Sequence, residues 1–415
     1  MTEQEIAQIG PEFSAHLGRF RKCFIQERSV THFDNYCRGL LSNVGRKSVE
    51  PMALASGTAV RTLQEFLKSG KWDHELARNL HQQGVLADLD ELPHDPLGRI
   101  GVIDETSHVK KGTKTPGVQR QWCGAVGKKE NCIVTVHTAV VQGEYKTLLD
   151  GDLFLPESWD ADRERCREAG IPGEIHYRAK WWIALEQQAR LAGNGLMFDW
   201  LTFDEGYGSK VPYLRLLNEV KQRFVGEVPV SFSVCRRMSE KSWRADECLP
   251  TTQTDRWRRF RLARRTLGHQ VWRAMEKRVW AAGRWHRLIA AINEATGEVK
   301  YFVTNELTGS LRRVLRVAFT RWNVEHVFRV AKQETGLTHY EGRHYQGLIR
   351  HLILGLIVIG FASRKVARLR GEKSADHLRT SLPGVEREMR GPLATPASHD
   401  GNAAHERSDP IPSAA

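Results

Sequence analysis

Two aspartates could do metal chemistry because each closes a short apolar run. Asp104 ends the segment RIGVID and Asp204 ends WLTFD. If both runs are neighbouring strands of one sheet, their carboxylates meet at one edge, where they repel each other unless a cation lies between them. A divalent metal ion with oxygen ligands removes that repulsion. An aspartate after a strand is also a good turn former, and for each acid alone that explanation stays open.

A third acid lies in a segment with helical spacing at 311–335. On a helix of 3.6 residues per turn, Arg321, Glu325 and Lys332 fall within about 40° of one another and form one charged stripe. On an isolated surface helix, an Arg321–Glu325 pair would contribute only about 0.2–0.5 kcal/mol. The same helix carries enough apolar side chains to pack on a sheet. We therefore expect the stripe at the rim of the sheet, where the aspartates end.

The elements that must position these acids follow from the hydrophobic pattern. Helical spacing dominates the first 95 residues, and β-branched apolar runs begin after a proline-bearing linker at 91–97. Strands are predicted at 99–104, 121–127, 133–142, 200–204, 228–234, 280–292 and 299–304, and helices at 177–191, 211–223, 311–335 and 348–364. Strands followed by helices indicate an α/β layered domain.

Charge and composition narrow the class of protein further. The 415 residues carry a formal net charge of +13, which favours an anionic partner such as nucleic acid. The longest apolar stretch, Leu352–Ala362, is too short to span a membrane, so no membrane partner is expected. No secretory leader is visible, and none of the seven cysteines is spaced as CxxC. We expect reduced thiols in a cytoplasmic protein.

Three motifs in order carry a resemblance to a known family. They are GVIDET around Asp104, TFDEGYG around Asp204, and RWNVEHVFRVAKQETGLTHYEGRHYQGLIRH around Glu325. With them, roughly residues 15–365 resemble the DDE-type transposases of bacterial insertion sequences, the DDE-superfamily endonucleases related to retroviral integrase and RNase H. In related elements the third motif reads Tyr, two residues, Arg, three residues, Glu, six residues, Lys. Arg321, Glu325 and Lys332 match that spacing, whereas Ala318 stands at the Tyr position.

The resemblance implies a fold and a division into domains. The expected fold is α/β, an RNase H-like mixed sheet flanked by helices. A helical DNA-binding domain at 1–95 would precede a DDE catalytic domain at 96–365, which contains a β-rich insertion at about 236–306. Residues 366–415 are polar and aperiodic, and we predict an unstructured tail there. An ordinary helical subdomain with a solvated basic face remains the alternative for residues 1–95.

The resemblance also implies an activity and partners. Asp104, Asp204 and Glu325 would be catalytic and would bind two Mg²⁺ ions, with Mn²⁺ as a substitute, for DNA cleavage and strand transfer. This is cut-and-paste transposition, a form of DNA recombination that moves a mobile element. Arg321 and Lys332 would hold DNA phosphates. The partners would be the terminal inverted repeats, target DNA and a second copy of the chain, in the bacterial cytoplasm at the nucleoid.

Two alternatives remain open at this stage. One is a catalytically decayed or domesticated transposase that only binds DNA. The other is a related nuclease that cuts structured DNA and does not join it.

Other residues are candidates for contact with DNA. Arg258 and Arg259 lie in a run with six arginines in ten residues at 256–265, and Arg343 lies in the loop THYEGRHYQG. The run could equally be a solvated surface. Two histidines in that loop lack a metal-ligand spacing, so contact with DNA is preferred over a metal site there.

Tryptophans in the β-rich segment have two interpretations. Trp280 and Trp285, and with them Trp272, could stack on an unpaired base at a cleaved DNA end, because related transposases with such an insertion form a hairpin intermediate. They could instead form the core of the insertion itself.

Overall fold

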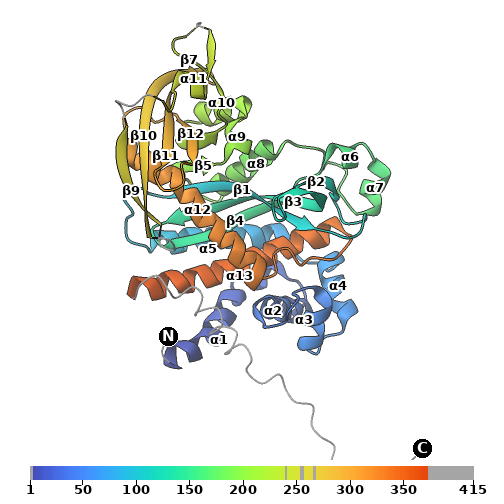
Figure 1. Ribbon diagram of the computed structural model, residues 1–415. Coiled ribbons are helices and arrows are strands. Elements are labelled where there is room, and N and C mark those ends of the chain that lie inside the picture. Colours follow the sequence, from blue (N-terminus) through green and yellow to red (C-terminus); the bar gives the residue numbers. More distant parts are fainter. Residues whose placement is uncertain (1–2, 239–240, 253–256, 265–267, 373–415) are drawn as a thin grey trace, which may run out of the picture.

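The computed structural model describes residues 3–238, 241–252, 257–264 and 268–372 (Figure 1). Within these parts the chain forms a mixed α/β fold built around one large sheet. Residues 373–415 of the predicted tail lie outside the described residues, as do both ends of the arginine run, 256 and 265. The last helix extends to Glu372, past the predicted start of the tail.

The centre of the sheet consists of parallel strands, with antiparallel strands on one side. The neighbours run β4-β3-β1-β5-β6, in which β1, β5 and β6 are parallel and β3 is antiparallel to both β1 and β4. The strands are β1 (Ile100–Val109), β3 (Lys128–Gln142), β4 (Tyr145–Leu153), β5 (Trp200–Phe203) and β6 (Phe224–Val228), and β2 (Gln119–Cys123) pairs with the start of β3.

Beyond β6 the sheet continues through antiparallel strands. These are β12 (Val299–Thr304), β11 (Arg284–Asn293), β10 (Gly268–Ala281) and β9 (Arg258–Arg264), with β7 (Ser233–Cys235) and β8 (Ser242–Arg244) at the end. The β10–β11 hairpin closes in two residues, Ala282 and Gly283, with φ of 47° and 83°. Positive φ at both positions is what a tight type I′ turn requires. The segment at about 236–306, which was predicted to be rich in β-structure, thus consists largely of strands.

Several predicted strands have other bounds in the structure. β1 continues to Val109, five residues beyond Asp104, where the strand was expected to end. The run 121–127 is a strand only as far as Cys123, and the run 280–292 is divided by the turn between β10 and β11.

The run 228–234 was expected to form one strand, but β6 ends at Val228 and β7 begins only at Ser233. Pro229 follows β6 directly, and proline has no N–H with which to continue a ladder. The true strand, FVGEV, begins four residues earlier and carries an acid, Glu227, next to its end.

Helices cover both faces of the sheet. One face packs against α12 (Leu311–Glu334), α13 (Tyr345–Glu372) and α5 (His74–Asp90), and the other against α8 (Lys180–Gly193) and α10 (Val211–Glu219). Short helices complete the layer and its loops: α6 (Glu157–Asp160), α7 (Arg163–Glu168), α9 (Glu205–Gly208) and α11 (Ala245–Cys248). The sheet therefore buries a hydrophobic core on each side.

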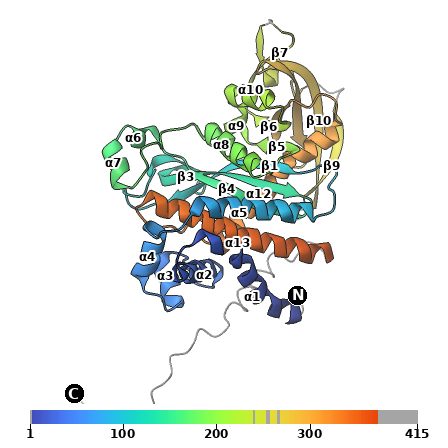
Figure 2. The ribbon, with the colours of Figure 1, turned by 180° about the vertical axis from the view of Figure 1, so that it is seen from behind.

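The remaining N-terminal helices pack against α13, on the side away from the sheet (Figure 2). They are α1 (Glu3–Gly18), η1 (Arg21–Cys23), α2 (Glu27–Leu41), α3 (Val49–Ala55) and α4 (Val60–Lys68). The buried guanidinium of Arg350 on α13 donates to the carbonyls of Phe66, Leu67, Gly70 and Trp72. This charged group thereby connects α13 to the carbonyls at the end of α4 and in the loop that follows it.

The apolar segment of α13 is a core element. Leu352–Ala362 is buried throughout, between β4, α5 and the N-terminal helices. None of the helices in the described parts of the chain combines the length and apolar character that crossing a membrane requires.

Candidate active site

Three acids stand in one row across the three parallel strands. Ile103 of β1 lies opposite Phe203 of β5, and Phe203 lies opposite Gly226 of β6. The next residue after each of these is acidic: Asp104, Asp204 and Glu227. Asp104 lies within β1, which continues to Val109, Asp204 directly follows the end of β5, and Glu227 is the last residue but one of β6. The parallel register puts all three at the same level of the sheet. The structure thus places Asp104 and Asp204 at neighbouring strand positions.

Asp204 has a local role as well. It is the N-cap of α9, and its Oδ1 accepts a hydrogen bond of 3.3 Å from the backbone N–H of Tyr207. Such a cap satisfies one of the free N–H groups at the start of a helix. The turn-forming explanation for Asp204 therefore holds, and it coexists with the position of this carboxylate beside Asp104.

The helix α12 brings Arg321 and Glu325 over this row. Nη1 of Arg321 is 3.7 Å from Oδ2 of Asp104 and 3.8 Å from Oε1 of Glu325, and its Nη2 is 3.5 Å from Oε2 of Glu227. The Arg321 side chain is 15% exposed, whereas Glu325 is 53% exposed. One guanidinium thus lies between two acids of the sheet and one acid of the helix.

Burial and neighbouring charges act on Asp104 in different directions. Burial raises the pKa of Asp104 to about 7; Arg321 opposes this rise, and the charge of Asp204 adds to it. The backbone N–H of Glu105 donates to Oδ1 of Asp104 at 2.8 Å, which also favours the ionised form. A carboxyl group that stays partly protonated at neutral pH despite an adjacent arginine lies in a place where further positive charge would be stabilised.

The donor set fits a hard divalent cation. All the converging side chains offer carboxylate oxygens, which are the ligands that Mg²⁺ and Mn²⁺ prefer. Among the described residues, no three acidic, histidine or cysteine side chains converge tightly enough to ligate a metal as they stand. Arg321 lies between Asp104 and Glu325, so a cation already lies where an ion would bring these carboxylates together.

Lys332 lies further along the same face of α12. Its Nζ lies 5.7 Å from the centre of the Phe328 ring, and burial lowers its pKa while the negative charge of Asp104 opposes that effect. The stripe of Arg321, Glu325 and Lys332 predicted from helical spacing thus lies on the side of α12 that faces Asp104.

The other candidates for DNA contact lie elsewhere. Arg343 is exposed, in the loop between α12 and α13. Arg258 and Arg259 lie on β9, where Arg258 pairs with Glu276 at 2.8 Å and Arg259 pairs with Glu294 at 2.6 Å. Both arginines are on the surface and already have a carboxylate partner.

The tryptophans divide into two groups. Trp272 is fully buried against Phe319 and Trp322 of α12, at ring-centre distances of 4.6 and 5.8 Å, and belongs to the core. Trp280 and Trp285 are half-buried at the closed end of the β10–β11 hairpin, where their rings meet edge to face at 5.6 Å. Only this second pair keeps surface that another molecule could contact.

Sequence reasoning missed Glu227 and its partner Lys300. Their side chains, 15% and 13% exposed, form an ion pair of 2.6 Å between β6 and β12. An acid inside the short apolar run FVGEV could have indicated Glu227. It was overlooked because the strand was predicted at 228–234, which begins after this acid.

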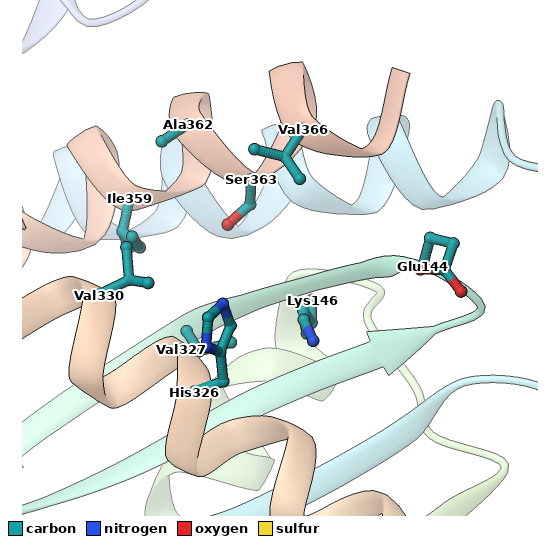
Figure 3. Close-up of a pocket in the computed structure, with 9 residues that line it drawn as sticks. All are labelled: Glu144, Lys146, His326, Val327, Val330, Ile359, Ala362, Ser363 and Val366. Carbon is teal, nitrogen blue, oxygen red and sulfur yellow. The ribbon is translucent and has the colours of Figure 1, made fainter. Parts of the chain in front are cut away.

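A pocket lies on another side of α12 (Figure 3). It opens between α12, α13 and the β3–β4 hairpin, and it is lined by Glu144, Lys146, His326, Val327, Val330, Ile359, Ala362, Ser363 and Val366. None of the acids that contact Arg321 lines it. The pocket and the row of acids are therefore separate features.

Fold and site together define an α/β protein in which three carboxylates lie side by side across the central parallel strands, with a fourth on the helix α12. The family described as DDE superfamily endonuclease matches residues 19–288, which is more than half of the chain. The chain belongs to this family, and the resemblance drawn from its motifs is confirmed. The matched residues include Asp104 and Asp204 and end before Glu325.

Two individual proteins are also similar to the chain. A probable transposase for insertion sequence element IS701 from Microchaete diplosiphon is 30% identical over 208 residues, an alignment that covers 50% of this chain and 50% of that relative. The chain thus matches about half the length of this curated relative. The crystal structure of the NurA nuclease from Sulfolobus solfataricus aligns with 62% of this chain and 91% of its own, at 9% identity. Its TM-score of 0.22 is too low to support a common fold.

Proposed function

We propose that the protein is a transposase of an insertion sequence, which cleaves DNA at the ends of its element and joins the cleaved ends to target DNA. The observation that carries the proposal is the grouping of Asp104, Asp204 and Glu325 around Arg321, on three elements far apart in the sequence. Membership of the DDE superfamily endonucleases supports the nuclease step, and DDE superfamily endonucleases generally use divalent metal ions.

The proposal includes a division of the chain into parts. We assign strands β4-β3-β1-β5-β6 to the RNase H-like core that the family resemblance implies, and strands β8 to β12 to the β-rich insertion at about 236–306. The catalytic domain would then comprise residues 96–365, and the helices within residues 1–95 would form the DNA-binding part.

In the proposed reaction, Asp104, Asp204 and Glu325 hold two Mg²⁺ or Mn²⁺ ions. When bound, such ions supply an activated water or 3′-hydroxyl and stabilise the leaving oxygen of an in-line displacement at phosphorus. Lys332 and Arg321 lie on the same face of α12 as Glu325, where their cations can hold the phosphates on either side of the cleaved bond. No nucleophilic side chain is needed for either step.

Surface residues would extend the contact with DNA. Arg258, Arg259 and Arg343 would bind phosphates along the duplex. Trp280 and Trp285, half-buried at the end of their hairpin, would stack on an unpaired base if cleavage proceeds through a hairpin at the DNA end. Gel analysis under denaturing conditions would trap that hairpin product, and its absence from an active reaction would contradict the stacking role.

Cleavage and joining test the proposal directly. The substrate is DNA that carries the inverted repeats flanking the gene, incubated with purified full-length protein and Mg²⁺ or Mn²⁺. We expect strand cleavage at the repeat ends, and joining of pre-cleaved ends to plasmid DNA. Binding without cleavage would favour a decayed transposase that only binds DNA, and cleavage without joining would favour a nuclease. Two copies of the chain bound to one pair of ends would support the expected homodimer.

A further inference from the structure

The two ends of the Arg321 guanidinium have different partners. Nη1 faces Asp104 and Glu325, two of the three residues expected to ligate metal, at 3.7 and 3.8 Å. Nη2 faces Glu227, at 3.5 Å. A planar guanidinium can engage anions along separate edges at the same time. Arg321 therefore lies between a group of expected ligands and one acid that is not among them.

Glu227 is suited to hold an arginine and poorly suited to ligate a metal ion. One oxygen, Oε1, accepts a hydrogen bond of 2.6 Å from Nζ of Lys300, and the other, Oε2, faces Arg321. Its side chain is 15% exposed, so both cations lie in a place where water screens them little. Because each oxygen already faces a cation, a metal ion at Glu227 would have to compete with Lys300 or Arg321.

We propose that Glu227 is a positioning residue that anchors Arg321 by one edge, so that the other edge is released toward a DNA phosphate once divalent cations neutralise Asp104 and Glu325. The proposal rests on the proposed transposase function. Metal ions at these carboxylates would repel Nη1, whereas Nη2 would keep its partner on β6. The guanidinium would then stay at the site instead of swinging into solvent.

The same geometry makes Arg321 a competitor of the metal ion in the DNA-free protein. If Glu227 is neutralised, Arg321 loses one of its partners and is shared by Asp104 and Glu325 alone. Its hold on these two carboxylates then strengthens, and a divalent ion must displace it. Glu227 therefore influences metal binding through Arg321, and its influence should disappear when Arg321 is absent.

A double-mutant cycle tests this dependence. Mn²⁺ affinity is measured on the DNA-free full-length protein from the electron paramagnetic resonance signal of free Mn²⁺. The variants are wild type, Glu227→Gln, Arg321→Met, and both together. We expect Glu227→Gln to weaken Mn²⁺ binding about 5-fold or more in the presence of Arg321, and less than about 2-fold in the Arg321→Met background.

Other outcomes overturn the proposal in distinct ways. Equal weakening in both backgrounds would make Glu227 a metal ligand or a long-range charge. An unchanged Mn²⁺ affinity in both backgrounds would make it a structural ion pair. If the wild type neither binds Mn²⁺ nor cleaves DNA, the transposase function fails and the positioning role fails with it. A wild type that binds and cleaves, without the coupling, refutes the positioning role alone.

A matched control is available beside Glu227. Glu298 also contacts Nζ of Lys300, at 3.4 Å, and is on the surface away from Arg321. Glu298→Gln removes the same charge from the same lysine, and we expect Mn²⁺ binding and cleavage at wild-type levels. Thermal unfolding in EDTA shows whether Glu227→Gln remains folded, and cleavage of end-containing DNA by that variant should fall at least 10-fold with the DNA affinity retained.

Discussion

The sheet carries two groups of carboxylates with arginines, and they are built in opposite ways. In the first, Asp150 and Asp152 of β4 share Arg190 of α8, at 2.8 and 2.6 Å, and Arg78 of α5 lies at 3.4–3.6 Å. Amide side chains of Gln82 and Gln187 donate to the same two aspartates. Burial alone would raise the pKa of Asp152, but the two arginines outweigh it and hold that pKa far below its usual value.

In the second group, around Arg321, every contact is 3.5–3.8 Å long. Here burial wins over the arginine, and the pKa of Asp104 rises to about 7. The first group pairs two carboxylates with two guanidinium groups, and these ion pairs connect α5 and α8 to β4. The second leaves negative charge uncompensated, which costs stability and is characteristic of sites that bind a cation. Compensation of charge, more than the residue types, separates a structural cluster from a candidate active site.

The largest effect in this comparison is expected when an acid of the group around Arg321 is replaced. Asp104→Asn, Asp204→Asn and Glu325→Gln should each lower metal-dependent cleavage by about 10²–10³-fold or more. These neutral variants keep the shape of the side chain, so filter-binding affinity for end DNA should stay within about 3-fold of wild type. Cleavage near the wild-type rate in any one variant would remove that residue from the site.

Loss of an arginine should lower the free energy of unfolding most in the cluster of Asp150 and Asp152. Arg190→Met leaves Asp150 and Asp152 with Arg78 as their one remaining guanidinium, at 3.4–3.6 Å, and we expect a loss of about 3–5 kcal/mol in the free energy of unfolding, measured with urea. Arg215→Met is the control, because Arg215 is exposed on α10 and its loss should change stability by less than about 0.5 kcal/mol. A loss below 1 kcal/mol for Arg190→Met would show that this cluster does not stabilise the fold.

The sequence was sufficient to predict one of these groups in part. Asp104 and Asp204 each close a hydrophobic run, and the assumption that these runs are neighbouring parallel strands predicts their closeness. The reason given for it holds only for Asp204, because β1 continues to Val109. The helical stripe of Arg321 and Glu325 follows from spacing alone. The assignment of these residues to catalysis stays a prediction until cleavage is measured.

Other features depend on pairings that no local pattern encodes. Glu227 joins the row only because Gly226 aligns with Phe203, and Pro229 ends the strand just after it. The cluster of Asp150 and Arg190 needs α8 to lie across β4, which is a consequence of packing and not of composition. The periodicity of apolar residues therefore could not predict the register of distant strands or the placement of the helices.

The two groups also differ in how their contribution to stability depends on pH. The pKa of Asp104 is raised in the folded protein and that of Asp152 is lowered, so the two contributions change with pH in opposite directions. The folded-state pKa of Asp104, about 7, is above the unfolded value of about 3.9, so the folded protein binds the extra proton between these pH values. In EDTA, the contribution of Asp104 to stability should therefore fall as pH rises from about 4 through 7. Asp152, with its lowered pKa, contributes stability that is lost only as pH falls below about 4.

Asp104→Asn isolates the first of these effects. Without a carboxyl group to ionise, the variant should exceed the wild type in stability at pH 8 by up to a few kcal/mol, and the two should converge near pH 4. Urea unfolding in EDTA at pH 4.5, 6 and 8 measures the difference. A constant difference across this range would show that Asp104 titrates in the folded protein as it does in the unfolded chain.

The smallest effect is expected at the arginines of β9, which combine features of both groups. Arg259 pairs with both oxygens of Glu294 as closely as the buried cluster does, yet its side chain is 71% exposed. An exposed pair contributes only about 0–1 kcal/mol, so a DNA phosphate can replace the glutamate at little cost.

Arg259→Ala should therefore flatten the dependence of log affinity on log salt by at most about 1, and Arg258→Ala should do the same. Glu294→Gln should act in the opposite direction, because it frees Arg259 and tightens DNA binding at low salt. Arg215→Ala on the distant surface is the control for general loss of charge. If Glu294→Gln leaves DNA affinity unchanged while Arg259→Ala also has no effect, this face of the sheet does not meet DNA, and its arginines serve only to pair with their glutamates.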